Sequence, residues 1–135
     1  MRSIADINKI GALCIRNKKL LVVHKKGIKD HISVGGKIEP GETDIQCLTR
    51  EVKEELGCGI KDPEYYDTFE AGSYDNKTIR MPCYFIELDD EIKLNPEDNI
   101  DGTLWIDKDY KKKGITLAPI LETFILPRLI KEGLL

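Results

Sequence analysis

Apolar residues are grouped along this chain in short runs separated by polar turns, a pattern typical of strands combined with a few helices. Residues 6–16 have a nearly continuous apolar middle, and a second apolar run follows at 20–23, so the two predict a hairpin. The pattern alone indicates an α+β fold. The remaining expected elements are strands at 31–34, 64–71, 78–88 and 104–106, a helical turn at 107–113, and helices at 43–56 and 118–131.

Two prolines modify these expectations. Pro82 lies inside the 78–88 run, and because proline cannot donate a ladder hydrogen bond, it predicts an edge strand or a bulge there. Pro127 lies inside the 118–131 helix, where the missing N–H and the ring must kink or break the helix.

The helix at 43–56 has clear start and stop signals. Thr43 and Gln46 have the spacing of a capping box, and Gly57 suits the left-handed residue that ends a helix. At 100° per residue, one narrow stripe of apolar side chains forms the expected buried side. This stripe consists of Ile45, Leu48, Val52 and Leu56.

Three carboxylates lie together on another side of this helix. Glu51 is three residues before Glu54 and four before Glu55, and Arg50 borders the same patch. Like charges at these spacings destabilise a helix, and acidic groups near its carboxyl end oppose the helix dipole. A solvated charged face is the simpler interpretation. The alternative is a divalent cation, since oxygen ligands suit Mg²⁺ or Mn²⁺.

Composition narrows the class of protein. A chain of 135 residues with 41% hydrophobic and 33% charged residues suits one domain, residues 1–135. Its net charge of −3, with no basic block, argues against binding polymeric nucleic acid. No apolar run approaches the roughly eighteen residues of a membrane span, and no signal peptide is evident, so a cytoplasmic location is expected.

The four cysteines are isolated in the sequence and are expected to be reduced core thiols. Cys47 lies nearest to the acidic side of the helix and is a candidate for lining a site there. With only two histidines, a structural zinc site is not expected. The cysteines are Cys14, Cys47, Cys58 and Cys83.

The segment 36–58 matches the pattern G-x5-E-x7-R-E-U-x-E-E-x-G-U, where U is aliphatic, and by this motif the chain resembles the Nudix hydrolases. Two features depart from the family pattern: Cys58 replaces the last aliphatic residue, and the usual W-x-x-P-G-G lead-in lacks its Trp and Pro. The resemblance implies a Nudix fold, a mixed sheet sandwiched between helices. The matching residues are Gly36, Glu42, Arg50, Glu51, Val52, Glu54, Glu55 and Gly57.

The resemblance also implies a reaction: hydrolysis, with Mg²⁺ or Mn²⁺, of a pyrophosphate bond in a nucleoside diphosphate linked to another group. It implies that Glu51, Glu54 and Glu55 are metal ligands, with Glu54 alternatively the general base. A backbone carbonyl at Gly36 or Gly35 is a further expected ligand. Arg50 is expected to orient Glu42 or Glu51, and Glu42 to act in this supporting role rather than on substrate.

Other candidate residues lie outside the motif. The family often has a further acid before the last strand, where this chain has Asn99 flanked by Asp98 and Asp101, and either Asp is a candidate. Tyr74 lies near the position of a tyrosine found in diadenosine-polyphosphate hydrolases of the family. The lysines at 25 and 26 are either solvated or in reach of a substrate phosphate.

The predicted substrate is a nucleoside triphosphate, canonical or oxidised, as for small MutT-like members, with diadenosine polyphosphates or another nucleotide as the alternative. A nucleotide sensor without catalysis is the alternative of another class. Such members usually lose motif carboxylates, which this chain retains. The protein is expected to be a monomer or a homodimer.

Overall fold

The computed structural model describes residues 5–72 and 75–135. Six strands follow one another in the sheet in the order β2-β3-β4-β1-β6-β5, and a seventh, β7, pairs with β3. Strands β1 and β6 are parallel, and every other pair is antiparallel, so the sheet is mixed. The strands are β1 (Ile7–Leu13), β2 (Ile15–Arg16), β3 (Lys19–Lys25), β4 (Ile32–Lys37), β5 (Ile60–Gly72), β6 (Thr78–Leu88) and β7 (Ile100–Ile106).

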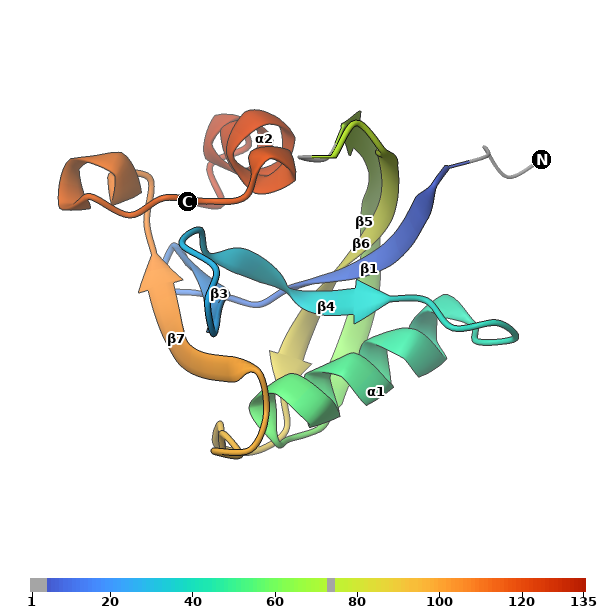
Figure 1. Ribbon diagram of the computed structural model, residues 1–135. Coiled ribbons are helices and arrows are strands. Elements are labelled where there is room, and N and C mark those ends of the chain that lie inside the picture. Colours follow the sequence, from blue (N-terminus) through green and yellow to red (C-terminus); the bar gives the residue numbers. More distant parts are fainter. Residues whose placement is uncertain (1–4, 73–74) are drawn as a thin grey trace.

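Helical segments cover both faces of this sheet. Figure 1 shows α1 (Asp44–Leu56) against one face and α2 (Leu126–Lys131) against the other. Alternating strand residues supply the two apolar cores: Ile10 and Ala12 of β1 pack on the α1 side, while Leu13 packs on the α2 side. The expected sandwich of a mixed sheet between helices is therefore confirmed.

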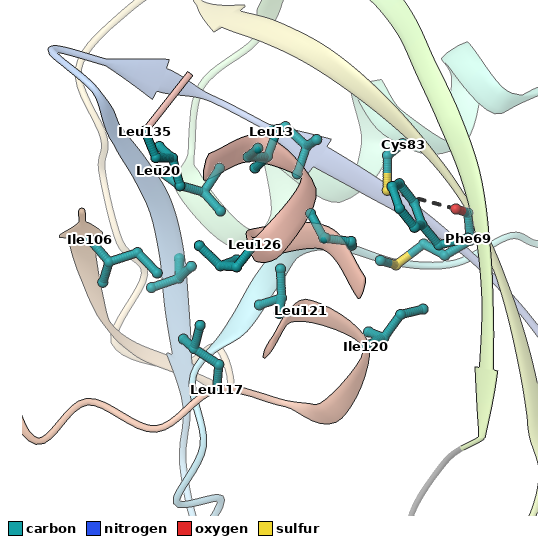
Figure 2. Close-up of a cluster of buried hydrophobic side chains, with 14 of the residues drawn as sticks. Leu13, Leu20, Phe69, Cys83, Ile106, Leu117, Ile120, Leu121, Leu126 and Leu135 are labelled. Carbon is teal, nitrogen blue, oxygen red and sulfur yellow. Dashed lines mark hydrogen bonds between the residues drawn. The ribbon is translucent and has the colours of Figure 1, made fainter. Parts of the chain in front are cut away.

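The core under the C-terminal segment is continuous from the sheet to the last residue. Figure 2 shows Leu121 and Leu126 packed among Leu13, Leu20 and Ile106. All five side chains are at most 1% exposed. Burial of this kind contributes about 1.5–3 kcal/mol per large aliphatic side chain. The C-terminal segment is therefore fixed to the sheet and can form a permanent wall of a neighbouring cavity.

Helix α1 begins and ends as predicted. The Gln46 N–H donates to Thr43 Oγ1 and the Thr43 N–H donates to Gln46 Oε1, which is the complete capping box. Gly57 ends the helix with φ 70°. One expected core residue is wrong, because Ile45 is 41% exposed. It lies in the first turn, where Cys47 takes the buried position instead.

Pro82 does not lie on an edge strand, because β6 is flanked by β1 and β5. The expectation that Pro82 marks an edge strand is therefore wrong. The proline pairs with Thr68 of β5, and the β5–β6 register shifts just before it, between Tyr65 and Asp67. The irregular ladder at this point tolerates a residue that has no N–H to donate.

Pro127 distorts the C-terminal helix, as expected. Residues Leu121–Ile125 form a π-helical segment, in which the Leu126 N–H donates to the Leu121 carbonyl five residues earlier. A π turn inserts one extra residue and so releases the position where the proline ring would clash. The helical course predicted at 118–131 is thus present but irregular.

The remaining elements differ from the predictions mainly in length. The predicted 6–16 strand divides into β1 and β2, and β2 forms the hairpin with β3 through Asn17 and Lys18, both with positive φ. Strands β4, β5 and β7 are longer than predicted. The 107–113 turn contains a 3-10 helix at Tyr110–Lys113. All four cysteines are free and buried. Within the described residues, no helix could cross a membrane.

The capping box predicts a measurable stability difference. Thr43→Ala removes one cap acceptor and should lower the free energy of unfolding by about 1 kcal/mol. Thr49→Ala is the matched control, because Thr49 is exposed in the same helix and bonds only the Ile45 carbonyl, a contact that does not favour helices. Urea unfolding of both variants checks this. Equal midpoints for the two variants would contradict the assigned cap.

Candidate active site

The site forms where the glycine pair of β4 meets α1. The Gly35 N–H donates to Glu55 Oε1 at 2.7 Å, so the strand backbone holds one carboxylate of the helix directly. A side chain at Gly36 would place its Cβ 2.5 Å from the Glu51 carboxyl carbon. Gly36 therefore leaves the space that the Glu51 carboxylate occupies, and the two glycines bring the strand against the acidic face of the helix.

Both of these carboxylates are removed from water. Glu55 is only 7% exposed, and its burial raises its pKa to about 7, although the Gly35 N–H acts in the opposite direction. Burial also raises the pKa of Glu51, against the opposing effect of Arg50. Burying a carboxylate favours its neutral form unless a positive charge compensates. A cation at this place would favour the ionised forms.

Arg50 is the compensating charge in the protein itself. Its Nε and one terminal nitrogen bind both oxygens of Glu42, at 2.7 and 2.9 Å, and the other terminal nitrogen lies 2.9 Å from Glu51 Oε1. It also donates to the Lys37 carbonyl. Glu42 and Glu51, the two alternative partners that the resemblance implied for Arg50, are therefore both contacted by it. The hydrogen bonds from Arg50 lower the pKa of Glu42 to about 2.

Glu54 is held less firmly than its neighbours. Its side chain is 58% exposed, and its contacts with the Arg50 guanidinium are long, at 3.3 and 3.4 Å. It faces a small hollow of about 230 Å³ together with Glu51, Glu55 and Asp98. Glu51, Glu54 and Glu55 therefore border one space, although Glu54 is much more exposed than the other two.

The structure separates the two candidate acids outside the motif. Asp98 lines the small hollow beside the carboxylates. Asp101 instead lies 2.6 Å from His24 Nδ1 and is not among the lining residues. Tyr74 lies outside the described residues. Cys47 is buried beneath Arg50, with its Sγ 3.8 Å from a guanidinium nitrogen, and lines neither this hollow nor the one described next.

A second, larger cavity of about 660 Å³ adjoins the small hollow. Lys25 and Glu51 line both spaces. Lys26 does not, and its ammonium group donates to the Pro96 carbonyl. Two further lysines that line the larger cavity, Lys9 and Lys37, were not predicted from the sequence. The signal for Lys9 was that it is the single charged residue within a mostly apolar strand.

The donors present suit a hard divalent cation, because they are carboxylate and backbone oxygens. Within residues 5–72 and 75–135, no three His, Cys, Asp or Glu side chains already form a metal cage. The Glu51 carboxylate faces Arg50, and the Glu55 carboxylate faces the Gly35 N–H.

Comparisons with known proteins agree with this geometry. A family model described as the NUDIX domain matches residues 8–118. This chain belongs to the Nudix family. As a Nudix hydrolase it acts on pyrophosphate bonds. The search of curated proteins found no match.

Solved structures with the same fold share little sequence with this Nudix chain. A UDP-X diphosphatase has a TM-score of 0.79 at 17% identity, covering 98% of this chain and 66% of that one. A MutT protein from Methanosarcina mazei Go1 has a TM-score of 0.74 at 19% identity and 94% coverage of both chains. A pyrophosphohydrolase from Bacillus subtilis has a TM-score of 0.73 at 21% identity, covering 98% of this chain and 85% of that one.

The contact between Gly36 and Glu51 predicts a loss of activity without unfolding. Gly36→Ala must push the Glu51 carboxylate from its place, and a displacement of about 1 Å can cost on the order of 100-fold in rate. Gly102→Ala is the control, because a Cβ there meets nothing within 4 Å. Steady-state hydrolysis rates of the two variants check this. Equal rates would show that the position of Glu51 is unimportant.

Proposed function

We propose that this protein hydrolyses nucleoside triphosphates, canonical or oxidised, to the nucleoside monophosphate and pyrophosphate, using Mg²⁺ or Mn²⁺. The observation that carries this proposal is the arrangement of Glu51, Glu54 and Glu55 around one small hollow that adjoins a cavity bordered by lysines. Carboxylates suit the metal, lysines suit the phosphate chain, and the cavity has room for the organic part of a nucleotide.

Each residue has a role that follows from its contacts. Glu51 and Glu55 would hold the metal together with a backbone carbonyl at Gly36 or Gly35, because they are the buried carboxylates against that turn. When bound, the metal would neutralise phosphate charge and acidify water. Arg50 would keep Glu51 in place while bound to Glu42.

Glu54 is the candidate general base. It is the most exposed of the three motif carboxylates and has only long contacts with Arg50, so it is free to accept a proton from water. Asp98 lies in the same hollow and would be the additional acid expected before the last strand. Asp101 is engaged with His24 and has no role in this proposal.

The substrate class is tested by incubating purified protein and Mg²⁺ with nucleoside triphosphates, oxidised triphosphates, diadenosine polyphosphates, ADP-ribose and nucleotide sugars, and identifying products by mass. Triphosphates should give the monophosphate and pyrophosphate. Cleavage of diadenosine polyphosphates alone would replace the proposed substrate. Nucleotide binding without any cleavage would support the sensor alternative.

Carboxamide variants test the roles of the carboxylates. Glu54→Gln should lower kcat by roughly 10²–10⁴-fold, as expected for loss of a general base, with little change in substrate affinity. Glu55→Gln should instead raise the Mg²⁺ concentration needed for activity, because the side-chain oxygen that faces Gly35 persists while the charge is lost. Glu91→Gln, at an exposed loop position, is the control. Wild-type kinetics in both site variants would refute the assigned site.

A further inference from the structure

The larger cavity has an aliphatic interior on the α2 side of the sheet. Its floor comes from neighbouring positions of β1, β4 and β6, and its wall comes from the start of the C-terminal helical segment. Charged side chains also line the cavity, among them the carboxylates Glu51 and Asp75, and Ser33 points its hydroxyl at the Met81 sulfur. The apolar side chains that line it include Ile7, Ile79, Met81, Ile120 and Leu121.

Three lysines line this same cavity. Lys9 of β1 and Lys37 of β4 are directly opposite each other in the antiparallel pair, where like charges are unfavourable, and Lys25 completes the group. Across the described part of the chain, no hydrogen bond or ion pair of the three ammonium groups is found. Glu51 lines the same cavity and, together with Glu55, attracts Lys9 at a distance, but neither forms a direct ion pair with it. Lysines that share a cavity without a direct ion pair indicate a site for an anionic ligand.

Lys9 and Lys25 are half-buried, whereas Lys37 is exposed, and of the two half-buried lysines only Lys9 is confined to the larger cavity. Burial lowers the pKa of Lys9, and the charges of Lys25 and Lys37 lower it further, against the opposing effect of Glu55 and Glu51. A partly desolvated ammonium gains more from a bound anion than an exposed one does, since it has lost part of its hydration. Lys9 is therefore a half-buried ammonium that faces only the larger cavity and would gain from a bound anion.

The arrangement of the two spaces gives the order of groups along a bound substrate. Glu54, Glu55 and Asp98 line only the small hollow, and Lys9 lines only the larger cavity. Lys25 and Glu51 lie at the junction of the two. A phosphate chain that reaches the carboxylates from the aliphatic cavity must pass this junction, which leaves the phosphate next to the organic group on the side of Lys9.

We propose that Lys9 binds the phosphate that stays attached to the organic part of the substrate, while the aliphatic cavity holds that organic part. The inference rests on the proposed hydrolysis and adds to it a division of labour among the positive charges. For a nucleoside triphosphate, Lys9 would contact the α-phosphate, and the pyrophosphate that leaves would lie on the side of the carboxylates.

Product binding distinguishes the two ends of the substrate. Isothermal titration with AMP, GMP, CMP and UMP, and separately with pyrophosphate, is made in Mg²⁺ on wild type and Lys9→Met. The variant should bind the preferred monophosphate about 10–100-fold more weakly, as expected for loss of a charge-assisted hydrogen bond. Its affinity for pyrophosphate should change by less than about threefold, which is below the effect of such a bond.

Two further variants separate a ligand contact from a structural role. Lys9→Arg keeps the charge and should retain most of the monophosphate affinity, and Lys61→Met, at an exposed position on β5 away from both spaces, should match wild type. Lys9→Met should have an equal or higher Tm than wild type, because it removes a repelled, partly buried charge. A lower Tm would assign Lys9 a structural role and overturn the proposal.

Unchanged monophosphate affinity in Lys9→Met, equal weakening of both products, or no monophosphate binding by the wild type would each overturn the inference. Hydrolysis measured on the same samples keeps this result separate from the proposed function. If the wild type cleaves triphosphates while Lys9→Met binds the monophosphate with normal affinity, the proposed function stands and the role of Lys9 is rejected.

Discussion

The contact between the β4 glycine pair and the acidic face of α1 is the constraint on which the site depends. One carboxylate, Glu55, is buried and accepts the Gly35 N–H, and another, Glu51, fills the space that a side chain at Gly36 would take. The cap at Thr43, the stop at Gly57 and the apolar core on the α1 side of the sheet fix the helix in the register that this contact requires. Substitution of either glycine would therefore alter chemistry as well as packing.

The same contact explains why Arg50 is needed. Three carboxylates close together oppose one another and the helix dipole, and burial adds to the free energy cost of ionising Glu51 and Glu55. The guanidinium binds Glu42 through two hydrogen bonds and Glu51 through a third, so it offsets part of this repulsion. A divalent cation would take over that role on the side facing the hollow.

Local features of the site could be predicted from the sequence, and contacts between distant segments could not. The limits of α1 depend on residues three or four positions apart, such as Thr43 and Gln46, and these were predicted correctly. The exposure of Ile45 and the buried place of Cys47 depend on how the helix meets the sheet. Pro82 was misplaced at an edge because the order of strands is set by pairing across the whole chain.

Long-range contacts also decided between the candidate acids and revealed the cavity lysines. Asp101 contacts His24, which lies 77 residues earlier in the chain, whereas Asp98 lines the small hollow beside the carboxylates. The meeting of Lys9 with Lys37 follows from the β1–β4 register. The resemblance to the family named Asp98 and Asp101 as candidates without deciding between them, and it gave no indication of Lys9 or Lys37.

The most direct test of the metal site is a Mn²⁺ titration followed by electron paramagnetic resonance, in which bound Mn²⁺ loses the sharp signal of the free ion. Wild type should bind Mn²⁺, Mg²⁺ should displace it, and Glu51→Gln and Glu55→Gln should each weaken binding strongly while the fold persists. Equal Mn²⁺ binding by wild type and both folded variants would contradict the account, because the carboxylates held against the glycine pair would then not be the ligands.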